Sequence, residues 1–151
     1  MIKIGIINGP NLNMLGKRDK KIYGNITLEE INHKLKTFAE REGIELIIRQ
    51  SNFEGEIIEF IQQFSSLVKG LIINPAAYTH YSYAIADAIR DCPIPVVEVH
   101  LSNIFSREDF RGNSVTAPAC IGQIAGFGYQ SYILAIHVLK DLLEKKPEEL
   151  K

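Results

Sequence analysis

The sequence predicts an α/β protein with a five-stranded parallel sheet covered by helices on both faces. Three observations predict this class: five short apolar segments, amphipathic segments that alternate with them, and a length of 151 residues, enough to bury a core without disulfides or metals. Strands buried on both faces are typically continuous apolar runs. Five strands favour the flavodoxin-like order 2-1-3-4-5 over the dinucleotide-binding fold, which usually has more strands. We therefore expect one flavodoxin-like three-layer domain over residues 1–151.

The expected strands are the apolar runs at residues 2–7, 44–49, 71–73 and 96–100, with a weaker fifth strand at residues 120–125. The first helix starts after Thr27, which forms a capping box with Glu30, and it ends at Gly43. Further helices are expected around residues 57–64, 81–90 and 132–143, where apolar side chains recur at helical spacing. The charged tail at residues 145–151 is expected to fray.

Composition and charge exclude several classes of function. The formal net charge is −1, so the chain has no overall field that would attract nucleic acid or an anionic membrane, and neither is an expected partner. No apolar run approaches the roughly 20 residues of a membrane span, and no signal-peptide pattern precedes the first strand. Cys92 and Cys120 match no metal or redox spacing and are interpreted as small buried apolar residues. We expect a soluble protein of a reducing compartment, most simply the cytoplasm.

The loop after the first strand is unusually long, extending from residue 8 to residue 24. Connections in such folds usually take about 2–6 residues, and longer loops tend to bind or react. This one combines Asn11 with Arg18 and Tyr23. Tyr23 could act as a base if the Arg18 guanidinium stabilised its phenolate; the alternative is a surface arginine and a packing tyrosine.

Polar residues gather where the expected strands end. In open parallel sheets a ligand sits outside the carboxyl ends of the strands. Those ends are rich in amides, contain His80 and His100, and are poor in carboxylates; they fall at residues 8–11, 50–52, 74–80, 98–102 and 125–128. The sequence therefore predicts a polar site at this edge of the sheet.

Glu98 and His100 lie two apart on one expected strand, so their side chains point to the same face. A carboxylate beside an imidazole can fix its tautomer and raise its basicity, which suits a general acid or base. The alternatives are a structural ion pair and a metal site with His80 as a third ligand. Asp87 follows His80 by seven residues, on the same face of an expected helix, where a single carboxylate is usually only solvated.

Arg107 and Arg111 lie four apart in the irregular segment at residues 102–114. Such a pair is either a solvated helical turn or a binding clamp, and we favour the first. The turn Gly126-x-Gly128 before the last helix is only a weak match to a nucleotide-binding turn, because Ser131 stands where a third glycine would be.

Six motifs occur in a set order along the chain. They are Gly9-Pro10-Asn11-Leu12-Asn13-x-Leu15-Gly16-x-Arg18 with Tyr23-Gly24, Gln50-Ser51-Asn52-x-Glu54-Gly55, Asn74-Pro75-x-Ala77-Tyr78-Thr79-His80, Glu98-Val99-His100-x-Ser102-Asn103, Arg107-Glu108-x-Phe110-Arg111, and Gly126-Phe127-Gly128. Together, from about residue 3 to residue 140, they resemble the type II 3-dehydroquinate dehydratases. The resemblance implies a flavodoxin-like subunit that converts 3-dehydroquinate to 3-dehydroshikimate in the shikimate pathway of aromatic amino acid biosynthesis. It also implies a reaction without metal or cofactor.

The resemblance implies a role for each matching residue. Tyr23 would remove the proton α to the ketone, and Arg18 would stabilise its phenolate and the transition state. Asn11 would hold a water against the enolate, while His100, oriented by Glu98, would protonate the departing hydroxyl. The substrate's carboxylate and hydroxyls would be held by Asn74, His80, Leu101, Ser102 and Arg111. The family also implies trimers assembled into a dodecamer, in which Asp87 reaches the site of a neighbouring subunit.

The chain departs from the family's usual pattern at Asp19-Lys20, Ala76, Gly112-Asn113 and Ser131. None of these positions carries a chemical role, so we expect them to affect rate more than function. Two other classes are alternatives: a flavin carrier, which would need a hydroxyl-rich phosphate loop after the first strand, and a phosphate-accepting receiver domain. A receiver needs an aspartate at the end of the third strand, where this chain has Asn74.

Overall fold

The computed structural model describes residues 1–145, and these contain a five-stranded sheet in which all neighbouring strands run parallel. Its strand order is β2-β1-β3-β4-β5, which confirms the predicted flavodoxin-like order. The strands are β1 (Ile2–Asn8), β2 (Ile44–Gln50), β3 (Gly70–Asn74), β4 (Val96–His100) and β5 (Gly122–Ala125). The register pairs Asn8 with Asn74, so the polar ends of β1 and β3 lie side by side.

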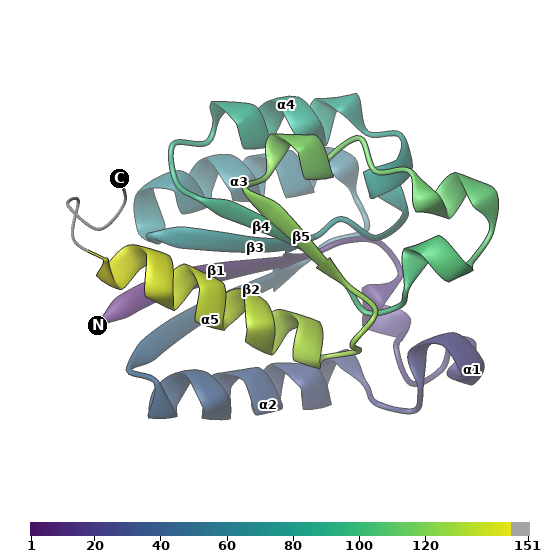
Figure 1. Ribbon diagram of the computed structural model, residues 1–151, viewed down its shortest axis with the longest axis horizontal. Helices are drawn as coiled ribbons and strands as arrows, with labels where there is room; N and C mark the ends of the chain where they lie inside the picture. Colours follow the sequence, from purple (N-terminus) through teal and green to yellow (C-terminus); the bar gives the residue numbers. More distant parts are fainter. Residues whose placement is uncertain (146–151) are drawn as a thin grey trace.

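Helices cover both faces of the sheet, with α2 and α5 on one face and α3 and α4 on the other (Figure 1). The α-helices are α1 (Lys20–Tyr23), α2 (Leu28–Arg41), α3 (Glu54–Leu67), α4 (Tyr83–Asp91) and α5 (Gln130–Glu144). Short 3₁₀ helices lie in the loops after β1, β3 and β4: η1 (Leu12–Met14), η2 (Ala76–His80), η3 (Ile104–Ser106) and η4 (Asp109–Gly112). A fifth, η5 (Ala117–Ala119), leads into the start of β5.

The two faces of the sheet bury separate apolar cores. Ile4 and Ile6 of β1 pack with α2 and α5, whereas Ile7 packs with α3 and α4. Side chains alternate between the faces of a strand, so Gly5 should face α3. A Cβ at Gly5 would lie 2.9 Å from the Phe64 ring, which shows that α3 packs directly on the β1 backbone.

The predicted start and end of α2 are confirmed. The Thr27 hydroxyl accepts a hydrogen bond of 3.1 Å from the backbone N–H of Glu30, which satisfies a donor left free in the first helical turn. Gly43 follows the helix with φ +72°, a left-handed conformation that favours glycine.

The expected position of α4 was wrong at its start. Ser82 caps α4 by accepting from the backbone N–H of Ile85, so the helix begins at Tyr83. His80 is the last residue of η2 and lies outside α4, and the prediction that it shares a helical face with Asp87 is therefore wrong.

The two cysteines are free and half-buried, and both pack against the core under α3 and α4. Burial raises the pKa of the Cys120 thiol above its ordinary value. No helix within residues 1–145 is both long and apolar enough to cross a membrane. Apart from Lys145, the tail expected to fray lies outside the described residues.

Candidate active site

A cavity opens at the carboxyl edge of the sheet, at the ends of β1, β3 and β4. The empty space in and above it is about 570 Å³, part of which is open to solvent. Its lining residues are Pro10, Asn11, Leu12, Arg18, Tyr23, Asn74, Ala76, Ala77, His80, His100, Leu101, Ser102, Ile104, Arg107 and Arg111. The cavity therefore gathers every site residue predicted from the sequence except Glu98, which lies directly behind His100, and Asp87.

The loop after β1 brings Tyr23 between two arginines. Asp19 caps the short helix α1 by accepting from the backbone N–H of Lys21, and Tyr23 is the last residue of that helix. Arg107 Nη1 donates to the Tyr23 hydroxyl at 2.8 Å, while the Arg18 guanidinium lies 4.1 Å from the centroid of the tyrosine ring. The structure thus brings Tyr23 and Arg18 together as predicted, and adds Arg107 at the phenol oxygen.

Arg107 also lines the cavity, although the sequence predictions gave it no role there. The sequence favours a solvated turn for Arg107, but the residue is half-buried, and its Nη1 donates to Ser102 Oγ at 3.2 Å as well as to Tyr23. It is 84 residues from Tyr23 in the chain. Its place in the same motif as Arg111 was the only sequence signal that could have identified it.

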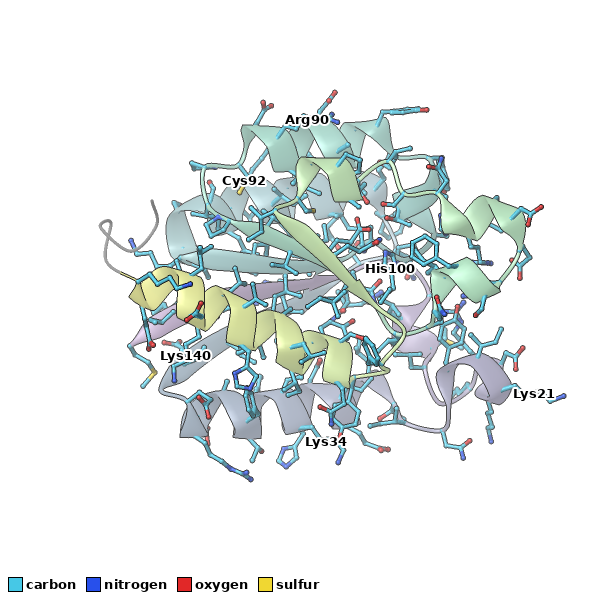
Figure 2. All side chains as sticks on the ribbon, viewed as in Figure 1. Lys21, Lys34, Arg90, Cys92, His100 and Lys140 are labelled. Atoms are coloured by element: carbon cyan, nitrogen blue, oxygen red, sulfur yellow. The ribbon has the colours of Figure 1, made fainter. Side chains whose placement is uncertain are left out.

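His100 also lines the cavity, and its ring contacts the buried carboxylate of Glu98. His100 Nε2 lies 3.0 Å from Glu98 Oε2, and the two side chains share one face of β4 as predicted. Figure 2 shows His100 at the carboxyl edge of the sheet. Nε2 is therefore engaged with Glu98, whereas Nδ1 makes no hydrogen bond within the described residues.

The burial of Glu98 raises the pKa of its carboxyl, but the hydrogen bond and charge of His100 lower it, as do the hydroxyls of Thr116 and Ser114. The lowering effects prevail, and the net pKa lies below its ordinary value. Although Glu98 is fully buried, its partners therefore hold it as a carboxylate at neutral pH. A carboxylate at Nε2 fixes the tautomer and the orientation of the ring.

His80 and Arg111 form the side of the cavity nearest η4. His80 Nδ1 lies 2.8 Å from the backbone oxygen of Asn113, and partial burial lowers the pKa of His80. Arg111 Nε donates to Oε2 of Glu108, the residue before η4. Among residues 1–145, no three histidine, cysteine, aspartate or glutamate side chains are grouped to hold a metal ion. The alternative of a metal held by His80, Glu98 and His100 is therefore not supported.

Asn74 is fixed by a buried network at the ends of β1 and β3. Its Nδ2 donates to the Tyr132 hydroxyl at 3.0 Å, and that hydroxyl donates to Asn8 Oδ1 at 2.5 Å. Its Oδ1 accepts from the backbone N–H of Ala76 at 3.1 Å. Ala76 has φ +52°, the left-handed region that favours the glycine usual in the family. One N–H of the Asn74 amide remains free for a ligand.

The remaining predicted residues come from the loops after β1 and β4. Asn11 has φ +67°, and its backbone N–H donates to Asn52 Oδ1 at 3.0 Å. The turn before α5 holds the backbone after β4, because the Gly128 N–H donates to the Leu101 oxygen at 2.9 Å. Ser131 supports this turn by accepting from the Phe127 N–H.

Asp87 is not brought into the cavity of its own chain. Its side chain is 76% exposed on α4 and pairs with Arg90, which lies on the outer side of that helix (Figure 2). A role for Asp87 in catalysis would therefore require the site of another copy.

Comparison with known proteins agrees with this arrangement. The chain matches the family described as dehydroquinase class II over residues 2–140. It is 55% identical to a 3-dehydroquinate dehydratase of Clostridium acetobutylicum over 144 residues, covering 95% of this chain and 100% of the relative. A 3-dehydroquinate dehydratase of Carboxydothermus hydrogenoformans is 51% identical, with 98% and 96% of the two chains covered.

Solved structures give the same result. The crystal structure of a type II dehydroquinase from Butyrivibrio crossotus superimposes with a TM-score of 0.90 at 49% identity, covering 92% of this chain and 97% of that one. Sequence, strand order and the contents of the cavity lead to one assignment: this chain belongs to the class II dehydroquinase family.

Proposed function

We propose that this protein is a 3-dehydroquinate dehydratase, which removes water from 3-dehydroquinate by anti elimination through an enolate and forms 3-dehydroshikimate in the shikimate pathway. The observation that carries the proposal is the Tyr23 hydroxyl, which accepts from Arg107 in a cavity that also contains His100. Elimination from a β-hydroxy ketone needs a base, an acid and a group that holds negative charge on the carbonyl oxygen. The side chains of this cavity can supply all three.

In the first step, the Tyr23 phenolate takes the proton from the carbon α to the ketone. A tyrosine hydroxyl is ordinarily protonated at neutral pH, so its ionised form needs stabilisation. The Arg107 guanidinium supplies this at the oxygen and Arg18 at the ring face. The electron pair of the broken C–H bond moves onto the carbonyl oxygen, where a water held by Asn11 stabilises the enolate.

In the second step, the enolate collapses and the β-hydroxyl leaves. Protonated His100 donates from Nδ1 to the departing oxygen, so the products are water and the conjugated enone. Glu98 keeps the ring in place through Nε2 and offsets its positive charge. The proton taken by Tyr23 then returns to solvent or to His100, which restores the starting state.

The substrate is held by groups that stand around the reacting carbons. We assign its carboxylate to the free N–H of Asn74, the backbone of Leu101 and Ser102, and its other hydroxyls to His80 and Arg111. Residues 17–24 form a lid that carries Arg18 and Tyr23 onto the substrate and excludes water.

We further propose that the enzyme assembles from trimers into a dodecamer, with Asp87 of one copy reaching the site of the next. The exposure of Asp87 and its distance from its own cavity support this role. The free thiols of Cys92 and Cys120 are consistent with a cytoplasmic enzyme.

The direct test is to add purified protein to 3-dehydroquinate and follow the near-ultraviolet absorbance of the conjugated product. Tyr23→Phe should abolish turnover and leave substrate binding largely intact, because only the reacting oxygen is removed. Tyr129→Phe is the matched control, since Tyr129 is also half-buried but lies outside the cavity. A folded wild-type protein that forms no product would refute the proposed activity, and near-normal turnover by Tyr23→Phe would refute the choice of base.

A further inference from the structure

Glu98 is held by more groups than its role beside His100 requires. Its side chain is fully buried on β4, yet it accepts hydrogen bonds from four side chains. They are His100 Nε2 at 3.0 Å, Ser114 Oγ at 2.9 Å, Gln123 Nε2 at 2.7 Å and Thr116 Oγ1 in a short bond. Buried charges persist only when they are well paired, so three donors besides the histidine call for an explanation.

The donors around Glu98 suit its ionised form. Ser114 and Thr116 each have one hydroxyl proton, and each directs it to Glu98. Thr79 Oγ1 lies 2.8 Å from Ser114 Oγ and 2.6 Å from Thr116 Oγ1, so the single Thr79 proton can go to either hydroxyl. A proton on Glu98 Oε1 would turn the Thr116 hydroxyl away from it, and a proton on Oε2 would meet three donors. All four side chains donate to Glu98 only when it is ionised.

The ionisation state of Glu98 decides which nitrogen of His100 carries the permanent proton. An ionised carboxylate can only accept, so the ring keeps its proton on Nε2. Nδ1 is then free to exchange a proton in the cavity. A neutral Glu98 would instead donate to Nε2 and place the permanent proton on Nδ1, where a general acid must be able to release it.

We infer that Thr116, Ser114 and Gln123 are positioning residues for the reaction: by holding Glu98 as a carboxylate, they keep the His100 proton on Nε2 and reserve Nδ1 for exchange with the substrate. They act through Glu98, since none of the three lines the cavity. The expected effect on the reaction rate rests on the proposed dehydratase function. The expected effect on the His100 tautomer rests only on the hydrogen bonds.

Other titratable groups face the pair without bonding to it. His80 on η2 and Cys120 after η5 interact electrostatically with Glu98, and Arg111 on η4 interacts with His80. Within the described part of the chain, none of these three donates a hydrogen bond to Glu98. Besides His100, the two hydroxyls and the Gln123 amide are therefore the groups that hold the carboxylate in place.

The test replaces Thr116 by a residue of similar shape without a donor. In Thr116→Val we expect a mixture of His100 tautomers, read from the ¹⁵N shifts of the imidazole in the substrate-free protein, and a fall in kcat of about tenfold with KM little changed. Thr116→Ser, which restores the hydroxyl, should recover the wild-type tautomer and rate. The matched control is Thr37→Val on α2, outside the cavity and the Glu98 network.

Gln123→Met removes another hydrogen bond to Glu98, from the half-buried edge strand β5. It is the second test variant if Thr116→Val fails to fold. A wild-type tautomer and kcat in whichever of the two variants is folded would overturn the inference. Failure of the proposed function would be seen differently. The wild-type protein would then form no product, but the ¹⁵N shifts would still show whether Thr116→Val changes the His100 tautomer.

Discussion

Replacing Arg107 by methionine is the sharpest test of how Tyr23 becomes a base. The substitution keeps a flexible apolar stem and removes the charge that contacts the Tyr23 oxygen at 2.8 Å. Two unit charges about 4 Å apart attract by about 4 kcal/mol at an effective dielectric constant of about 20. Because Arg107 is half-buried, solvent screening reduces this to about 2 kcal/mol, which corresponds to a loss of about 30-fold in kcat.

The assay is steady-state formation of the conjugated enone, measured for four proteins: wild type, Arg107→Met, Tyr23→Phe and the double variant. If Arg107 acts through the tyrosine oxygen, its loss should matter only when that oxygen is present. Arg107→Met should therefore change the residual rate of Tyr23→Phe very little. KM should rise modestly in Arg107→Met, since the bond to Ser102 is also lost.

Equal losses in the two backgrounds would refute this reasoning, because they would show that Arg107 acts independently of Tyr23. Arg41→Met at the end of α2 is the control for loss of an arginine away from the cavity. Arg18→Met gives a useful contrast. Its guanidinium faces the ring and not the oxygen, and such contacts contribute about 0.5–2 kcal/mol, so a smaller coupling with Tyr23 is expected.

Three further predictions follow from the packing around the cavity. Tyr132→Phe should lower the free energy of unfolding by about 1–3 kcal/mol, because Asn8 and Asn74 lose a buried hydrogen-bond partner, and it should raise KM. An unchanged midpoint of urea denaturation would contradict this. Ala76→Gly should be at least as stable as wild type, since glycine relieves the left-handed backbone at this position. The neighbouring Ala77→Gly should lose about 0.5–1 kcal/mol of the free energy of unfolding, and equal losses in the two variants would argue against strain at Ala76. The Glu98 carboxyl has a folded pKa below its ordinary 4.5, so its stabilising effect is complete above pH 4.5 and is lost as the pH falls from there through the folded pKa; a urea midpoint that rose on acidification would contradict this sign.

The sheet and most of the cavity could be predicted because both depend on local patterns. The apolar runs marked the strands, and the rule that ligands bind at the carboxyl ends of parallel strands placed Asn74, His80 and His100 together. The spacing of Glu98 and His100 on one strand was enough to predict that they touch. These features need no knowledge of distant parts of the chain.

Features that depend on long-range contacts were not predictable. Arg107 meets Tyr23 only because the loops after β1 and β4 fold over the same cavity, and no local pattern encodes that meeting. The start of α4 was misplaced because apolar spacing alone places the helix start at Tyr81. In the structure, η2 ends at His80 and the Ser82 side chain caps α4, so the helix begins only at Tyr83. The hydroxyl network around Glu98 likewise joins β4 to residues 114–116 and to β5.

The bond between Tyr132 and Asn8 also has a consequence for folding. It joins the last helix to the first strand across 124 residues, and the same hydroxyl orients Asn74 from the middle of the chain. A newly made chain therefore cannot complete its substrate-binding groups until α5 has docked on the sheet. Recovery of enzymatic activity during refolding should report this final docking step, and it should lag behind signals that detect the helices and strands alone.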